Sequence, residues 1–404
     1  HVGGQVVHDA QVLNGHLAAA AVVAALCCMP ALSGCFGETY IEYTLYSSED
    51  EVIRTDNFSV NPDKPDGSSD GDSADSPDPA PEGSYYMVTG YSGKPVDLVV
   101  PAEIGGTPVR GIGEQAFINC KSLVTLTVEE GVSEVGIAAF VYCISLQEAV
   151  LPSTMNVGES MFGGCDRLQS VTLPEGITSI GNRAFQQCYA LSEINADESN
   201  PVNLPSTLTF IGGNAFFYCY ELSGEIVIPA GVTEIMQYSF ANCINVTSFV
   251  IDGDVTAIGD GAFGGCHSAE SIDIPSAVTS IGDYAFSNTY EFDSLTLPEN
   301  LTYLGQYAFQ ASGVASVAMP QGKGVWLYAE ELAEDDPETE EDESIAPGSE
   351  EAEDLLFSFY YSEDVKDDPS AKGRIPSYEL TDGEQAAEWL NEDLLTAYWY
   401  FVAV

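Results

Sequence analysis

The sequence is poor in positive charge. Only 11 of its 404 residues are Lys or Arg, against 63 Asp or Glu, which gives a formal net charge of -52. A surface of this kind repels nucleic acid and anionic lipid headgroups, so we expect no nucleic-acid partner. It favours cationic ligands, divalent ions or basic patches on a partner, although high charge is also an ordinary means of staying soluble.

Histidines and metal-binding motifs are also scarce. Three of the four histidines fall within the first 16 residues, so His267 is the only one in the rest of the chain, and there is no Cys-x-x-Cys motif. Zinc sites and nucleophilic sites depend on such groups, so we expect no metal, no cofactor and no enzyme. Carboxylates are abundant but do not form a recognisable catalytic pair, which leaves a carbohydrate-active enzyme as the less favoured alternative.

The N-terminal part of the chain contains one long hydrophobic run, from Leu17 to Ala31. It has the length of an export signal and is too short for a membrane span of roughly 20 residues. The quartet that follows, Leu32 to Cys35, resembles the bacterial lipobox, which implies a signal peptide over 1–34 and a lipid anchor at Cys35. No Lys or Arg precedes Leu17, unlike the usual basic start, so a cleaved signal without lipid and an uncleaved anchor remain alternatives.

Residues 35–84 are expected to be a lipid-anchored spacer with a disordered linker. Apolar and aromatic residues at short spacing within 36–60 favour a strand. Residues 61–83 consist almost entirely of Pro, Asp, Ser and Gly, which cannot bury enough surface to offset chain entropy. We therefore predict a disordered stalk there.

The strongest signal is an internal repeat. Phenylalanine recurs in steps of 23, 22, 23, 31, 24, 23, 23 and 23 residues. Such a period is typical of a solenoid in which each repeat forms one coil, so we predict an aromatic spine inside the stack. The 31-residue step contains extra residues at 196–203, predicted to form a projecting loop. The phenylalanines are Phe117, Phe140, Phe162, Phe185, Phe216, Phe240, Phe263, Phe286 and Phe309.

Each phenylalanine stands in a repeated context. The pattern apolar-x-x-apolar-Gly-x-x-Ala-Phe runs, for example, from Ile177 to Phe185, and strand-like segments such as Leu168 to Leu173 end at a proline. We expect the glycine to supply a positive φ in a tight turn. Met236 replaces it in the sixth repeat, where the turn must differ.

Cysteine follows the phenylalanine by three residues in seven repeats. Seven thiols cannot all pair with one another, and one thiol per coil suggests a column of small buried groups. We predict free thiols that hydrogen-bond to the backbone, with Thr289 and Ser312 replacing them in the last two repeats. The cysteines are Cys120, Cys143, Cys165, Cys188, Cys219, Cys243 and Cys266.

Together with the lead-in YYMVTGYSGKPVDLVVPAEIGGTPVRGIGEQAF at 85–117, this pattern resembles the BspA-like leucine-rich repeat proteins. The resemblance implies a β-rich leucine-rich-repeat solenoid over 85–320, with one short strand per coil of roughly 23 residues. It also implies an adhesin-like bacterial surface protein without catalytic residues. We therefore expect a lipid-anchored cell-surface protein that binds an extracellular protein or glycan partner; an envelope protein without a specific ligand is the alternative.

Two surfaces are candidates for binding. The turns carry an aromatic strip, Tyr142, Tyr189, Tyr218, Tyr220 and Tyr290. The outward strand positions form a hydroxyl-rich face that either is merely solvated or binds an extended polymer weakly at many points. These positions are Thr125, Thr127, Ser170, Thr172, Glu193, Asn195, Ser271, Asp273, Ser294 and Thr296.

The repeat ends after Pro320. Residues 321–354 include a nearly continuous acidic run and are expected to be a low-complexity segment. Residues 355–404 are predicted to be a small α+β cap, with a strand at 355–361 and a helix at 381–396. Repeat arrays need their open ends covered, so strands of this cap should pair with the last coils.

Overall fold

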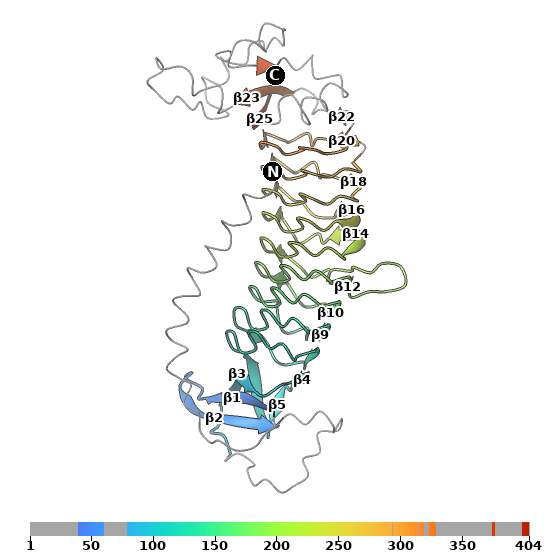
Figure 1. Cartoon of the computed structure of the whole chain (residues 1–404). Coiled ribbons are helices and arrows are strands. Elements are labelled where there is room, and N and C mark those ends of the chain that lie inside the picture. Colours follow the sequence, from blue (N-terminus) through green and yellow to red (C-terminus); the bar gives the residue numbers. More distant parts are fainter. Residues whose placement is uncertain are drawn as a thin grey trace, which may run out of the picture. The chain divides into compact units, whose positions relative to one another are not determined.

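The computed structural model places the repeat region as a stack of coils (Figure 1). No helix occurs in the part of the chain that it describes, and hence no helix there could cross a membrane. The structure describes residues 39–59, 79–292, 294–314, 316–318, 323–328, 374–375 and 398–403. Several predictions lie outside these ranges: the signal peptide, Cys35, the acidic segment from 329 on, the strand at 355–361 and the helix at 381–396.

One face of the stack consists of short parallel strands, one from each coil, that pair with the strand of the next coil. This first face contains three sheets. The largest contains β4 (Asp97–Val100), β7 (Thr125–Val128), β9 (Glu148–Val150), β10 (Ser170–Thr172) and β12 (Glu193–Ile194). The second contains β14 (Ser223–Ile228), β16 (Asn245–Ile251) and β18 (Ser271–Ile272), and the third contains β20 (Ser294–Thr296) and β22 (Ser316–Ala318).

A second row of strands runs along another face, so most coils carry two short strands rather than the one predicted. The cause of the error is their length: nearly all have two residues, too few to show an alternating pattern. They are β6 (Thr107–Ile112) with β8 (Glu134–Val135), β11 (Ser179–Ile180) with β13 (Phe210–Ile211), and the series β15 (Glu234–Ile235), β17 (Ala257–Ile258), β19 (Ser280–Ile281) and β21 (Tyr303–Leu304). We call this the second face.

The predicted aromatic spine is confirmed. All nine phenylalanines are buried, and each ring stacks on the next with centroids between 5.1 Å (Phe117–Phe140) and 5.9 Å (Phe240–Phe263). Tyr91, which the repeat pattern did not single out, extends the spine below Phe117 at 5.6 Å. Burial of this tyrosine, with a smaller influence from Cys120, raises its pKa to about 12.

The cysteine column is confirmed as a ladder of free, buried thiols. From the second coil on, each Sγ donates to the carbonyl of the spine phenylalanine one coil below, as in Cys143 to Phe117 (3.2 Å) and Cys188 to Phe162 (3.2 Å). The same carbonyl also accepts the backbone N–H of its own coil's cysteine, such as Cys120 to Phe117 at 3.0 Å. Thr289 instead donates to Phe286 within its own coil. The thiols therefore satisfy backbone acceptors inside the stack.

The repeated glycine plays a different role from the one predicted. None of these glycines, such as Gly136 or Gly181, has a positive φ. They are needed because coils approach closely there: a Cβ on Gly181 would lie 2.7 Å from the backbone nitrogen of Glu159. The positive φ values fall two residues later, for example at Ala138 and Arg183.

The turn at Met236, predicted to differ, keeps the repeated geometry: Tyr238 two residues later has φ 53°, and Ser239 N donates to Met236 O at 3.2 Å as Ala184 N does to Gly181 O. The difference lies in the strand pairing of this coil. The second face is interrupted there, because β13 ends one sheet and β15 begins the next. Glycine N–H groups in other coils bond to the coil below, as Gly259 does to Ile235 O at 2.8 Å. A side chain prevents the close approach that this ladder needs.

An antiparallel hairpin precedes the first coil, which confirms the strand predicted within 36–60 and shows that residues 39–59 are more than a spacer. β1 (Tyr40–Tyr46) pairs with β2 (Val52–Ser59) and with β3 (Tyr85–Ser92), which joins β6 of the second face in parallel. β5 (Glu103–Ile104) flanks β6. Ile41, Tyr43 and Leu45 are buried in the common core, so residues 39–59 fold with the stack and cover its first coil.

Three strands lie at the other end of the second face. β25 (Tyr398–Ala403) pairs antiparallel with β21, then β23 (Lys323–Tyr328) with β25, and β24 (Arg374–Ile375) with β23. The last strand therefore pairs with the last coil, in the segment for which a cap was expected. The boundary of that cap at 355 stays a prediction.

Candidate functional site

The first face presents two regular rows of side chains between β4 and β12. In one row, Asp97, Thr125, Glu148, Ser170 and Glu193 lie opposite one another in register on neighbouring strands. Carboxylates and hydroxyls therefore alternate from strand to strand. Because paired strands are 4.7–4.9 Å apart, successive carboxylates are about 9–10 Å apart.

The second row alternates in another way. Val99, Thr127, Val150 and Thr172 follow one another in register, so a methyl-bearing side chain projects from every coil. Val99 is 55% exposed and, with Val150, adds apolar side chains to a surface otherwise made of hydroxyls and carboxylates. The two rows together form a flat patch, which we call the row surface.

The row surface is partly held by its own hydrogen bonds. Thr125 Oγ1 donates to Asp97 Oδ1 at 2.7 Å, and farther along the face Ser248 Oγ lies 3.4 Å from Glu225 Oε2. Hydroxyl and carboxylate side chains opposite one another thus stabilise strand pairing. The alternating carboxylate and hydroxyl side chains therefore stabilise the sheet and also present hydrogen-bond acceptors to solvent.

Asn195 does not belong to this surface, although it was predicted with it. It adopts φ 48°, and its side-chain amide donates to Leu173 O (2.7 Å) and Asn203 O (2.9 Å) while accepting from Leu173 N (2.8 Å). The side chain is therefore used to close the inserted loop. Asparagine is among the residues that tolerate this backbone conformation.

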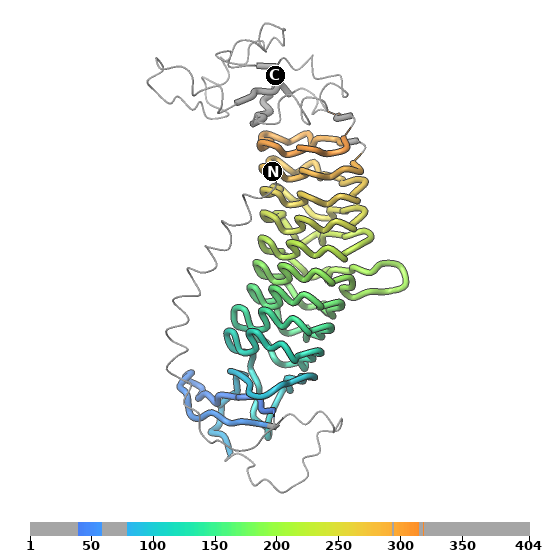
Figure 2. The backbone as a smooth tube through the Cα atoms, viewed as in Figure 1, coloured from blue at the N-terminus to red at the C-terminus, as the bar shows by residue number. Residues whose placement is uncertain are grey.

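The inserted residues 196–203 do project from the stack as predicted (Figure 2). Asp197 Oδ1 accepts from Ser199 N (2.7 Å), Ser199 Oγ (2.6 Å) and Asn200 N (2.9 Å), and these hydrogen bonds lower the pKa of Asp197. Asn200 Nδ2 also donates to Glu225 O at 2.9 Å, on the next strand of the face. The loop thus fills the break between β12 and β14.

This break separates the predicted site residues into groups. Thr125, Thr127, Ser170, Thr172 and Glu193 lie on the row surface below it. Ser271 and Asp273 are exposed in the coil of β18, and Thr296 is exposed on β20, which also contains Ser294. The structure therefore assembles half of the predicted face into one regular surface.

A depression in the second face marks the short, 22-residue step of the repeat. Where the next coil reads Pro174-Glu-Gly-Ile-Thr-Ser-Ile-Gly181, this coil reads Pro152-Ser-Thr-Met-Asn-Val-Gly158 and lacks one residue. Asn156 Oδ1 accepts from Thr178 N (2.8 Å), Ser179 N (3.1 Å) and Thr178 Oγ1 (3.2 Å). In other coils a backbone carbonyl takes this place, as Thr256 O does for Thr279 N at 2.9 Å.

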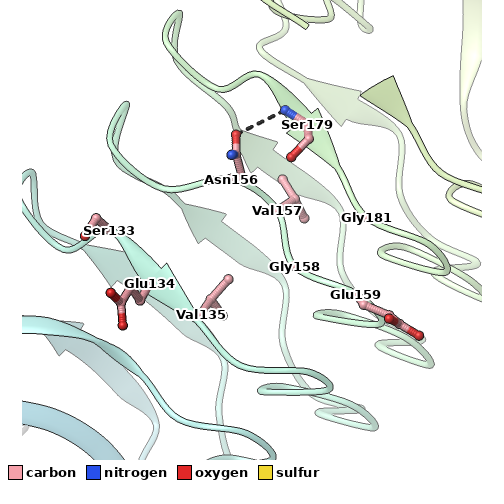
Figure 3. A pocket seen from close by; sticks show the side chains of 9 residues that line it. All are labelled: Ser133, Glu134, Val135, Asn156, Val157, Gly158, Glu159, Ser179 and Gly181. Carbon is pink, nitrogen blue, oxygen red and sulfur yellow. Dashed lines mark hydrogen bonds between the residues drawn. The ribbon is translucent and has the colours of Figure 1, made fainter. Parts of the chain in front are cut away.

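The missing residue leaves an open hollow of about 530 Å³ (Figure 3). The glycine-to-carbonyl hydrogen bond seen between Gly136 N and Ile112 O (2.8 Å) is not formed between Gly158 and Val135 in these described coils. The hollow therefore exposes backbone groups to water. Its lining residues are Ser133, Glu134, Val135, Asn156, Val157, Gly158, Glu159, Ser179 and Gly181.

Aromatic residues line the turns. Of the strip predicted there, Tyr189 stacks on Tyr220 at 5.4 Å and Tyr218 contacts Tyr220 at 5.6 Å. Tyr142 is 38% exposed, and Tyr290 stacks on His267 at 4.8 Å. The prediction missed further rings near them, Phe217, Tyr238, Tyr284 and Tyr307. Tyr238, Tyr284 and Tyr307 recur two residues before a spine phenylalanine, which is the signal that identifies them.

In the part of the chain that the structure describes, no three His, Cys, Asp or Glu residues are placed to hold a metal ion. The surfaces above can offer hydrogen-bond acceptors, negative charge and aromatic rings.

Several solved structures of other repeat proteins are similar to this chain. A leucine-rich repeat protein from Bacteroides ovatus is 26% identical with a TM-score of 0.52, over 58% of this chain and 60% of that one. The Leucine Rich Repeat protein of T. pallidum is 26% identical (TM-score 0.36, over 56% of this chain and 80% of that one). A leucine rich cell surface protein of Faecalibacterium prausnitzii is 21% identical (TM-score 0.28, 58% and 90%).

The chain thus spans 60% of the length of the Bacteroides ovatus protein that it matches. Among curated proteins, no sequence matches it. The family model for the BspA type leucine rich repeat region, in six copies, matches residues 104–222 and 198–315, more than half of the chain. With its stacked coils, phenylalanine spine and thiol ladder, the chain belongs to the family of BspA-type leucine-rich repeat proteins.

Proposed function

We propose that this chain is an exported, lipid-anchored surface protein that binds an extracellular protein or glycan partner through the row surface. The observation that carries the proposal is the strict register of that surface. Side chains that repeat every coil can contact an extended or repetitive partner at several points at once. Many weak contacts of this kind add up to useful avidity.

The chemistry of the row surface defines what it prefers. Its carboxylates and hydroxyls accept hydrogen bonds, so a partner that presents donors or positive charge along a line is favoured. The valine and threonine methyl groups beside them offer apolar contact. An acidic glycan or a nucleic acid is disfavoured by the same carboxylates.

The proposed anchoring rests on the sequence between Leu17 and Cys35, where an export-length apolar run precedes the lipobox-like quartet. Mass spectrometry of the mature N-terminus tests it. A diacylated Cys35 is the expected result. A mature chain that starts elsewhere and carries no lipid would contradict the anchor while leaving the binding proposal intact.

The binding proposal is tested by a screen against matrix proteins, mucins and glycans, followed by variants of the row surface. Thr127→Lys with Thr172→Lys places two cations in the second row and should abolish binding of any ligand found. Thr233→Lys with Thr256→Lys makes the same charge change at exposed positions in the turns that lead to the second face and serves as control. Equal loss in both variants, or no ligand in the screen, would favour an envelope protein without a specific ligand.

A further inference from the structure

A cluster of aromatic rings lies on the turns where the fourth, fifth and sixth coils follow one another. Phe217 and Tyr218 have centroids 4.0 Å apart, and Phe217 lies 6.1 Å from Tyr238 of the next coil. On the other side, Tyr218 contacts Tyr220, which stacks on Tyr189 of the coil below. We call these five residues the aromatic edge.

The position of Tyr238 is prepared by the next coil. The Cδ1–Cε1 edge of its ring occupies the space that a side chain at Gly261 would fill, and Gly261 has φ +56°. Tyr142 is seated in the same way over Gly164, with φ +69°. Each of these tyrosines is nevertheless 38% exposed. A ring held against backbone but open to solvent loses little freedom on binding, which favours it as a contact residue.

The surroundings of these rings are acidic. The pKa of Tyr189 is raised first by burial, then by Tyr220 and by the negative charge of Asp166. The pKa of Tyr284, farther along the turns, is raised by burial, by Tyr307 and by Asp283. Asp166 therefore lies within electrostatic range of the aromatic edge, and Asp283 within range of the neighbouring Tyr284, in a chain whose formal net charge is -52.

We propose that the aromatic edge is a docking surface for a basic protein partner, whose Arg and Lys side chains pack against the tyrosine rings. Tyrosine is enriched at the energetic centres of protein interfaces, and a cation over an aromatic face is attracted by the ring. The chain itself contains such a contact, with the Arg110 guanidinium 4.7 Å from the ring centroid of Tyr85. This surface is distinct from the row surface, so the two can be tested separately.

Binding of a fluorescent oligoarginine peptide, measured by anisotropy at moderate and raised salt, tests the proposal. The double variant Tyr218→Ala, Tyr238→Ala leaves the net charge unchanged and is expected to weaken binding about tenfold, because two ring contacts are lost. Phe210→Ala removes an aromatic side chain of similar exposure (40%) from the second face and should change binding less than about twofold.

An oligolysine peptide of the same length should bind more weakly than oligoarginine, because the guanidinium stacks better on rings. Thermal unfolding of both variants establishes that each is folded. Unchanged oligoarginine binding by the tyrosine variant would overturn the proposal, since charge alone would then account for the affinity. Binding of neutral dextran that the same variant abolishes would overturn it as well, because the edge would then recognise glycan.

Discussion

Two columns of side chains, one inside the stack and one outside, obey different rules. The inner column is phenylalanine in all nine coils, and its rings stack at nearly constant spacing. The column four residues later begins Lys121, Ile144, Asp166, Tyr189 and Tyr220. An inner residue must fit between two identical neighbours, whereas an outer one meets only water on its far side. The fold is therefore carried by the repetition inside, and any specificity must be sought in the irregularities outside.

The largest expected difference between the buried and the exposed columns is a loss of folding stability at alkaline pH, caused by the buried thiols. The pKa of all seven thiols is raised, in Cys143 first by the neighbouring Cys165 thiol and in the other six first by burial, as for Cys266 to about 12, so they stay protonated in the folded chain. In the unfolded chain they ionise near pH 9, so the stability from a raised pKa is full below pH 9 and is lost as pH rises above it. Each thiol weakens folding by about 1.4 kcal/mol per pH unit there. Denaturant unfolding at pH 7, 9 and 10 measures this.

The variant Cys188→Ala should show a shallower alkaline slope than the unmodified chain, because one ionising group is gone. Thiol reagents should also fail to label the folded chain at pH 8. Rapid labelling of all seven thiols without unfolding would contradict their burial.

A truncation in the spine should produce the next largest effect. Phe185→Ala leaves a cavity between Phe162 and Phe216, whose rings lie 5.5 and 5.4 Å from it. We expect a loss of about 3–5 kcal/mol in the free energy of unfolding, measured by denaturant titration. Tyr290→Ala, in the outer column, is the matched change and should alter stability by less than about 1 kcal/mol. Similar losses in both would erase the distinction between the columns.

The repeated glycine Gly181 can be compared with Gly163, a glycine outside the repeated Gly-x-x-Ala-Phe position. A Cβ on Gly181 would lie 2.7 Å from Glu159 N, whereas one on Gly163 would meet its nearest atom at 3.6 Å. Gly181→Ala should therefore destabilise the chain by about 1–3 kcal/mol through overpacking. Gly163→Ala should be close to neutral. If both variants melted at the same temperature, close approach would not explain the repeated glycine.

The smallest expected loss of stability concerns Asn156, an exposed residue whose side-chain oxygen replaces a backbone carbonyl as hydrogen-bond acceptor. Asn156→Ala removes the acceptor of Thr178 N and Ser179 N, and water can replace it only in part because the site is exposed. A loss of about 1 kcal/mol is expected in thermal or denaturant unfolding. Inserting a serine between Asn156 and Val157 restores the usual repeat length and should raise the melting temperature; a lower one would contradict the account of the hollow.

The sequence was sufficient for the inside of the molecule. Phenylalanine and cysteine recur at fixed spacing because every coil buries them in the same place, so the spine and the thiol ladder followed from the pattern. The role of the glycine did not follow, since a close approach to Glu159 and a positive φ both require glycine and leave the same trace in sequence. A strand within 36–60 was predicted, but its pairing into a hairpin that covers the first coil was not, because an isolated pair of strands carries no repeat.

The outside was less predictable. Outward positions in the strands followed from alternation, but the pattern could not tell that the amide of Asn195 is used within its own loop. Asn156 was missed although a step of 22 residues marks its coil, because the length of a step does not say which side chain replaces the lost backbone. Tyr238 was missed because its seat, Gly261, belongs to the next coil.

A double-mutant cycle along the spine tests most directly whether the coils form one continuous stack. Alanine substitutions at Phe162 and Phe185, whose rings are 5.5 Å apart, should interact, so that their joint effect differs from the sum by about 0.5–3 kcal/mol. Substitutions at Phe117 and Phe286, far apart along the stack, should add within about 0.5 kcal/mol. Additive effects for the neighbouring pair would show that these rings do not stack and would contradict the account.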